Sequence, residues 1–224
     1  MGTSCDDGHG DLPILLTDHG PYAIMTLNRP QSLNCLTLTM MGLMTEAIES
    51  VRGNSRFLSL IMTGSGGVFS AGANLSEVST LDPASAIDFS RRGQSLLNSL
   101  DSAAPLTIAA IDGYCLGGGL DIALSCDLRY ATPRTSIQHP GTKRGLITGW
   151  GGTQRLARMI GADAARRLLV SGERIDAPEA YRLGLVDRVC EDALASARQL
   201  AERIAGRFSR DQLVAIKNEL SVEN

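Results

Sequence analysis

The sequence predicts an α/β fold built as a single domain of 224 residues. Short apolar segments of strand character alternate along the chain with amphipathic segments of helical spacing. Two of the apolar segments run directly into glycine-rich loops, at residues 64–75 and 113–119. Such alternation is typical of layered α/β proteins with right-handed crossover connections.

Each expected element has its own signal in the sequence. Strands are expected where short runs are apolar, at residues 22–27, 57–63, 106–111, 128–131 and 185–189. Helices are expected where apolar residues recur every three or four positions, at residues 37–51, 83–100, 120–125, 150–159, 162–170, 178–183 and 193–205. In the first of these helices Leu38, Met41, Met44 and Ile48 share one face, and we interpret its methionines as core filling.

Composition excludes several classes of protein. The net charge is −3 and basic residues form no long run, so a nucleic-acid partner is not expected. The five cysteines are scattered without paired spacing, which predicts reduced thiols in a cytoplasmic protein and neither a disulfide framework nor a zinc site. No apolar run reaches membrane length, and no cluster of His, Asp and Glu suggests a metal site.

The second glycine-rich loop carries most of the functional signal. Three consecutive glycines, Gly117, Gly118 and Gly119, stand where a helix is expected to begin. The first N–H groups of a helix have no internal acceptor, so such an end suits an anion or an oxygen that becomes one during a reaction. The alternative is a tight strand-to-helix turn with no ligand, and the glycines alone leave both interpretations open.

Six motifs in a fixed order resemble the crotonase family, also called the enoyl-CoA hydratase/isomerase superfamily. They are residues 28–36, 64–75, 113–127, 151–156, 171–177 and 184–186. The resemblance implies a crotonase-like spiral of ββα repeats and a substrate that is an acyl-CoA thioester. Coenzyme A would then enter as part of the substrate, and no separate cofactor is expected.

In this family two backbone N–H groups form an oxyanion hole for the thioester carbonyl. The matching residues here are Ala73 and Gly118, and losing one such donor typically raises a reaction barrier by about 2.7–4 kcal/mol. By the same resemblance Ala71, Asn74, Leu75 and Gly117 line the substrate. In the family a basic residue within the motif at residues 28–36 helps to bind a coenzyme A phosphate, and this chain has a glutamine at that position. Arg29 is therefore the candidate for binding the phosphate, and a structural hydrogen-bonding role for Arg29 stays open.

The chain departs from the hydratases of the family at both of their glutamates. Asp121 stands at the first position and Gly141 at the second. Glycine cannot transfer a proton, so the resemblance favours chemistry with one carboxylate, such as double-bond isomerisation, over efficient hydration. The Asp121 side chain is one methylene shorter than that of glutamate. The alternative to a catalytic role is a structural one, in which Asp121 lies in the first turn of a helix and accepts hydrogen bonds from its free N–H groups.

Two further residues lie close to the missing glutamate in the sequence. His139 is a candidate for proton transfer, because a histidine side chain can both accept and donate a proton, or else it is a histidine with a satisfied hydrogen bond. Trp150 is a candidate for shaping the pocket, or else a core residue. Gly141 itself would border the substrate.

Three segments divide the chain. Residues 1–20 are expected to be a mobile leader, because they lack the pattern of a signal peptide. By the resemblance, residues 21–205 are expected to form the crotonase-like core, and residues 206–224 the start of a helical C-terminal region that is shorter than in the family. The corresponding family helices help trimers to assemble, so a homotrimer or hexamer is implied only if this short region suffices.

Three functions remain open from sequence. The first is an enzyme that acts on an acyl-CoA thioester through the oxyanion hole, by isomerisation or other single-carboxylate chemistry such as decarboxylation or thioester hydrolysis. The second is a non-catalytic paralogue that binds acyl-CoA, and the third is an assembly subunit without a ligand. Protection from thermal unfolding by a CoA thioester would count against the third.

Overall fold

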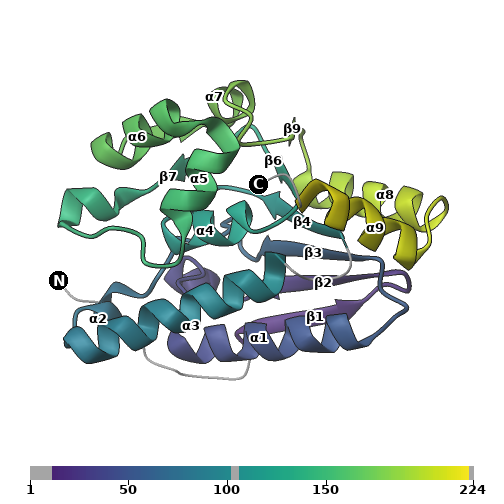
Figure 1. Cartoon of the computed structure of the whole chain (residues 1–224), viewed down its shortest axis with the longest axis horizontal. Helices are drawn as coiled ribbons and strands as arrows, with labels where there is room; N and C mark the ends of the chain where they lie inside the picture. The colour runs from purple at the N-terminus through teal and green to yellow at the C-terminus, as the bar shows by residue number, and fades with distance from the viewer. Residues whose placement is uncertain (1–11, 102–105, 222–224) are drawn as a thin grey trace.

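The computed structural model describes residues 12–101 and 106–221, and two sheets organise them (Figure 1). The larger sheet has the order β1-β2-β3-β4-β6-β9 and the smaller sheet β5-β7-β8. The larger contains β1 (Ile14–Asp18), β2 (Tyr22–Leu27), β3 (Ser59–Gly64), β4 (Leu106–Ile111), β6 (Leu128–Ala131) and β9 (Arg188–Val189). The smaller contains β5 (Tyr114–Leu116), β7 (Ser136–Gln138) and β8 (Arg174–Asp176).

Helices follow the strands in the expected alternation. They are α1 (Leu38–Gly53), α2 (Leu75–Val78), α3 (Pro83–Asp101), α4 (Gly118–Leu124), α5 (Gly152–Ile160), α6 (Ala162–Ser171), α7 (Ala177–Arg182), α8 (Ala193–Ala205) and α9 (Arg210–Ser221). Two short 3-10 helices, η1 (Pro30–Ser32) and η2 (Pro140–Arg144), interrupt the loops. The α/β prediction is confirmed.

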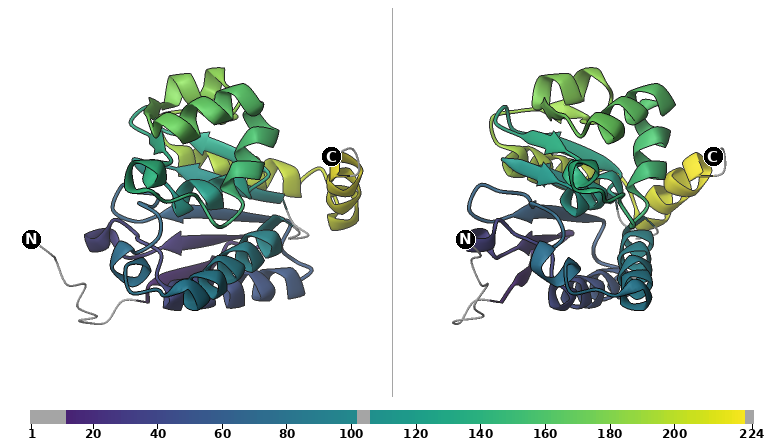
Figure 2. Two further views of the ribbon diagram at one scale, coloured as in Figure 1. Left: turned by 60° about the vertical axis from the view of Figure 1, so that its left-hand side comes forward. Right: turned by 90° about the vertical axis from the view of Figure 1, so that its left-hand side faces the viewer.

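The larger sheet is buried on both faces, and its central strands are mostly apolar. Ile24, Ile61 and Ile108 stand in register on one face and pack against α8. Their neighbours Met25 and Met62 belong to the other cluster, which α1, α3 and α4 cover. Figure 2 shows α8 and the pair α1 and α3 on opposite sides of this sheet. Strands buried on both faces are expected in a parallel sheet.

Two predictions of elements need correction. Residues 14–18, expected within a mobile leader, form β1, which pairs antiparallel with β2 and completes the edge of the sheet; residues 1–11 lie outside the described residues. The smaller sheet was not predicted, because strands of three residues are too short to show a period-two pattern. This smaller sheet carries the glycines of the second loop.

Candidate active site

A buried asparagine organises the first glycine-rich loop. The Asn34 side chain is fully buried, and its Nδ2 donates hydrogen bonds to the carbonyls of Ser65, at 3.0 Å, and Val68, at 2.6 Å. Its Oδ1 accepts from the Arg29 N–H at 2.8 Å. Leu33 and Asn34 adopt positive φ angles of 53° and 52°, so this turn is wound tightly against the loop. The 28–36 motif therefore shapes the loop from beneath.

The two glycine-rich loops touch through their backbones. A Cβ added to Gly72 would lie 2.6 Å from the Leu116 carbonyl oxygen and 2.9 Å from the Gly118 nitrogen. A Cβ on Gly119 would lie 2.6 Å from the Ser70 carbonyl oxygen. Neither position has room for a side chain, so the glycines allow the close approach of the two loops.

The N–H groups of Ala73 and Gly118 are oriented by the elements around them. Ala73 forms a parallel bridge with Leu36, in which the Leu36 N–H donates to the Gly72 carbonyl and the Asn74 N–H donates to the Leu36 carbonyl. Because successive N–H groups alternate along an extended chain, the Ala73 N–H points away from Leu36. Gly118 is the first residue of α4, where an N–H has no acceptor inside the helix.

Asp121 lies one turn into α4 and is held on both carboxylate oxygens. Its side chain is 2% exposed. The Nε2 atom of His139 is 3.0 Å from Oδ1, and the Thr148 hydroxyl donates to Oδ2 at 2.6 Å. A Cβ on Gly152 would lie only 1.9 Å from Oδ1, so the start of α5 also closes on this carboxylate. Sequence reasoning found Asp121 and His139 but missed Thr148, which has no local motif.

Gly141 is enclosed by the backbone of its own loop. It lies in η2, and its carbonyl oxygen accepts the Leu146 N–H at 2.9 Å. A Cβ added there would lie 2.9 Å from the Leu146 carbonyl oxygen. The structure therefore supplies no second carboxylate at this position, and a side chain there requires the loop to move.

Several predicted substrate-binding residues have structural partners. Asn74 caps α2 by accepting the Ser76 N–H at 3.0 Å. The Ala71 N–H donates to the Leu33 carbonyl, and Gly117 adopts a φ of 51° that favours glycine. Leu75 is 46% exposed beside the first loop.

A buried cysteine lies beneath the second loop. Burial raises the pKa of the Cys115 thiol well above its usual range, and the nearby Asp121 carboxylate raises it further. The thiolate is the nucleophilic form of cysteine, so this residue stays a thiol at physiological pH. Cys115 is therefore a core residue of β5.

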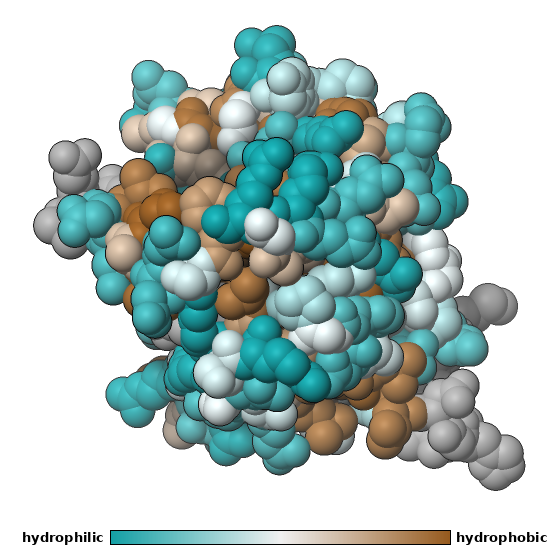
Figure 3. Space-filling model, turned by 90° about the vertical axis from the view of Figure 1, so that its right-hand side faces the viewer, coloured by the Kyte–Doolittle hydropathy of each residue, from teal (hydrophilic) through white to brown (hydrophobic). Residues whose placement is uncertain are grey.

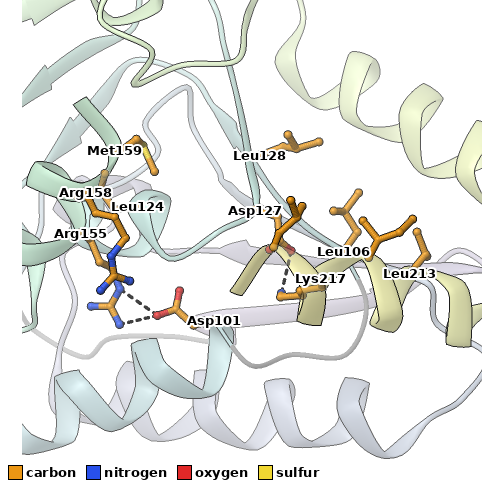
Figure 4. A pocket seen from close by; sticks show the side chains of 12 residues that line it. Asp101, Leu106, Leu124, Asp127, Leu128, Arg155, Arg158, Met159, Leu213 and Lys217 are labelled. Atoms are coloured by element: carbon orange, nitrogen blue, oxygen red, sulfur yellow. Dashed lines mark hydrogen bonds and ion pairs between the residues drawn. The ribbon is translucent and has the colours of Figure 1, made fainter. Parts of the chain in front are cut away.

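A separate cavity of about 540 Å³ lies at the opposite end of α4, between the body of the molecule and α9. Leu124 and Met159 contribute to its wall, and ion pairs of Asp101 with Arg155 and of Asp127 with Lys217 cross it (Figure 4). Figure 3 shows the side of the molecule that carries α8 and α9, where hydrophobic side chains lie among hydrophilic ones. None of the residues predicted for the site lines this cavity.

The described part of the chain contains no cluster of three or more His, Cys, Asp or Glu residues that could hold a metal ion. Within residues 12–101 and 106–221, no helix has the length and apolar character needed to cross a membrane.

Proteins of similar sequence share most of this chain. A short-chain-enoyl-CoA hydratase of Clostridium acetobutylicum is 35% identical over 205 residues, which cover 91% of this chain and 78% of the relative. A crotonyl-CoA hydratase of Syntrophomonas wolfei is 34% identical and covers 87% of this chain and 76% of the relative.

Solved structures agree with these relatives. An enoyl-CoA hydratase from Bacillus anthracis superposes with a TM-score of 0.90 at 29% identity, over 94% of this chain and 83% of the other. DspI from Pseudomonas aeruginosa superposes with a TM-score of 0.88 at 32% identity, over 96% of this chain and 82% of the other. These similarities confirm the predicted crotonase-like fold. Residues 20–223 also match the model of the enoyl-CoA hydratase/isomerase family, and the chain therefore belongs to this family of enzymes.

Proposed function

We propose that the protein binds an acyl-CoA thioester and stabilises its enolate with the N–H groups of Ala73 and Gly118. The observation that carries this proposal is the backbone contact between the two glycine-rich loops, which brings the segment before Ala73 next to the Gly118 nitrogen. Two preorganised donors stabilise a developing oxyanion without reorganisation, and this effect is large in a site that excludes water.

Asp121 is the proposed acid and base. Its carboxylate would take the proton from the carbon next to the thioester carbonyl, which leaves the enolate at the two N–H groups. Asp121 would then return the proton to the γ carbon of the resulting dienolate. This shifts the double bond and leaves the composition of the substrate unchanged. Each carboxylate oxygen has two lone pairs, so Asp121 can accept a proton while His139 and Thr148 keep their hydrogen bonds.

His139 and Thr148 are proposed to orient Asp121. A carboxylate only accepts hydrogen bonds, so Nε2 of His139 carries the hydrogen while Asp121 is ionised. The Nε2 atom of His139 contacts Oδ1 of Asp121 at 3.0 Å, and this contact favours orientation of the carboxylate over proton transfer by His139 itself.

Hydration is the second candidate, because the relatives from Clostridium acetobutylicum and Syntrophomonas wolfei are named as hydratases. Addition of water needs one group that positions the water and one that handles the α proton. The enclosed Gly141 supplies neither, so we favour isomerisation. A paralogue that binds acyl-CoA without chemistry is the alternative to both. The absence of a cofactor, the trimeric or hexameric assembly and the cytoplasmic location also stay predictions.

The test is an assay of the purified protein with 2-enoyl-CoA and 3-enoyl-CoA thioesters. The products are separated by chromatography, and their masses are measured by mass spectrometry. An unchanged mass with a shifted retention time is the expected result. We expect Asp121→Asn to reduce kcat by roughly 10²–10⁴-fold, the usual contribution of a general acid or base. Thermal protection by the thioester should persist in this variant.

Each other outcome points to a different function. Gain of one water would establish hydration, and loss of coenzyme A would establish hydrolysis. Loss of carbon dioxide from a malonyl-type CoA thioester, assayed beside the enoyl thioesters, would establish decarboxylation. Binding without any product would favour the non-catalytic paralogue. Equal turnover by wild type and Asp121→Asn would remove Asp121 from the mechanism.

A further inference from the structure

Trp150 occupies a space made for it by two glycines on different helices. A Cβ added to Gly93 of α3 would lie 2.2 Å from both Cδ1 and Nε1 of the indole. A Cβ added to Gly118 of α4 would lie 2.5 Å from Cζ3 at the other end of the ring. Any larger residue at either position would overlap the ring, so the indole fills the gap between α3 and the start of α4. It is 3% exposed.

The loop that carries Trp150 is tied down on both sides of the residue. The Gly149 carbonyl accepts a hydrogen bond from Nε2 of Gln94 at 2.7 Å. The Trp150 carbonyl accepts one from Nη1 of Arg155 at 2.9 Å, and Arg155 is also paired with Asp101. The ring of Phe89 packs against the indole, with 5.3 Å between the ring centres. Because the surrounding residues hold it, the indole forms a fixed wall beside the start of α4.

This wall adjoins one of the proposed oxyanion donors. Gly118 contributes both the N–H that would bind the thioester oxygen and the Cα that touches the indole. A carbonyl oxygen bound to that N–H lies about 3 Å from the nitrogen. The six-membered part of the indole therefore lies beside the residue that would bind the thioester oxygen.

We propose that Trp150 closes the acyl end of the site and restricts the enzyme to short-chain acyl groups. This inference rests on the proposed function, since it requires the thioester carbonyl at Gly118. A butenoyl chain ends before the ring, whereas a decenoyl chain must pass it. Gly93 sets the position of the wall, because only glycine lets the indole lie back against α3.

The experiment compares butanoyl-CoA with decanoyl-CoA as ligands and the butenoyl and decenoyl thioesters as substrates, in wild type and Trp150→Ala. Wild type should prefer the short chain in both assays. The variant should raise the ratio of decenoyl to butenoyl kcat/KM by roughly 10–100-fold. One methylene more or less in a hydrophobic pocket changes the specificity of an enzyme by about 10–200-fold. Trp150 is the only tryptophan of the chain, so butanoyl-CoA should change the wild-type fluorescence more than free coenzyme A does.

Phe57→Ala is the matched control, because Phe57 is a buried aromatic residue just before β3, outside the proposed site. Its chain-length ratio should equal that of wild type. Where Trp150→Ala does not fold, Trp150→Leu replaces it and should raise the ratio less. An unchanged ratio in a folded Trp150 variant, or a wild type that prefers decanoyl-CoA, would overturn the inference. Because saturated thioesters bind without turnover, the chain-length preference can be measured even where the proposed reaction fails.

Discussion

At the scale of single residues, the environment of Asp121 decides which chemistry is accessible. The carboxylate is buried, and its two oxygens are each held by a side chain from a different segment, His139 and Thr148. A buried carboxylate without partners would be costly, so these two contacts stabilise the residue as well as orient it. The enclosed Gly141 leaves the site with this one carboxylate.

Thr148 provides the sharpest test at this scale. Thr148→Val keeps the shape of the side chain but removes the hydroxyl that donates to Asp121 Oδ2. Hydrogen bonds to charged groups contribute about 1.5–3 kcal/mol, so kcat should fall on the order of 10–100-fold with KM nearly unchanged. Thr148→Ser keeps the donor and should retain most of the activity. Equal kcat values for the valine and serine variants would show that the hydroxyl does not position Asp121.

At the scale of elements, the first glycine-rich loop depends on a turn far from it in sequence. Asn34 bonds to the backbone at Arg29, Ser65 and Val68, and the loop's own Ser70 hydroxyl donates to the Asn34 carbonyl at 2.8 Å. The loop itself carries three positive-φ glycines, at residues 66, 67 and 72. Such a loop has few conformational restraints of its own, so Asn34 supplies them.

Asn34→Ala should therefore destabilise the protein and the site together. The change leaves three half-buried backbone groups, at Arg29, Ser65 and Val68, without their partner and places alanine at a φ of 52°. Unsatisfied buried groups cost about 1–3 kcal/mol each, and we expect a loss of roughly 2–5 kcal/mol in the free energy of unfolding, measured by urea denaturation. Asn54→Ala is the control, since the Asn54 side chain at the end of α1 accepts the Arg56 N–H, a single hydrogen bond among the residues that the structure describes. A similar loss in both variants would contradict the role of Asn34.

At the scale of the whole molecule, the two sheets are connected where the chain passes between them. Asp112 lies between β4 and β5, and Arg134 lies between β6 and β7. The Arg134 guanidinium binds both oxygens of Asp112, and the Thr132 hydroxyl donates to Oδ1 at 2.8 Å. These contacts hold the smaller sheet, and with it the second glycine-rich loop, against the larger one.

This connection should make stability depend on pH. The Arg134 guanidinium lowers the pKa of Asp112 below its ordinary value, and the Thr132 hydrogen bond adds to the effect. A carboxyl with a lowered pKa in the folded state stabilises the protein above its unfolded pKa of about 3.9 and loses that contribution as the pH falls through the folded pKa. Asp112→Asn should therefore lower the Tm at pH 7, and the difference from wild type should shrink below about pH 4. A difference in Tm that stays constant from pH 7 to pH 3 would contradict this.

The amino-acid sequence was enough to predict every strand of the larger sheet except β1, the long helices, both glycine-rich loops and the family. The signals of these features are local. A buried parallel strand is a continuous apolar run, and two loops whose backbones touch need glycine at the contact. It also brought Asp121 and His139 into the candidate site, and the structure places them 3.0 Å apart.

The remaining features depend on contacts between segments that are distant in the sequence. The smaller sheet consists of strands of three residues, and its pairing comes from contacts between distant segments. Thr148 reaches Asp121 across 27 positions, and Trp150 fits between Gly93 and Gly118 because three separate segments meet there. Local patterns report which face of an element is buried, whereas the identity of what packs against that face depends on how the whole chain folds.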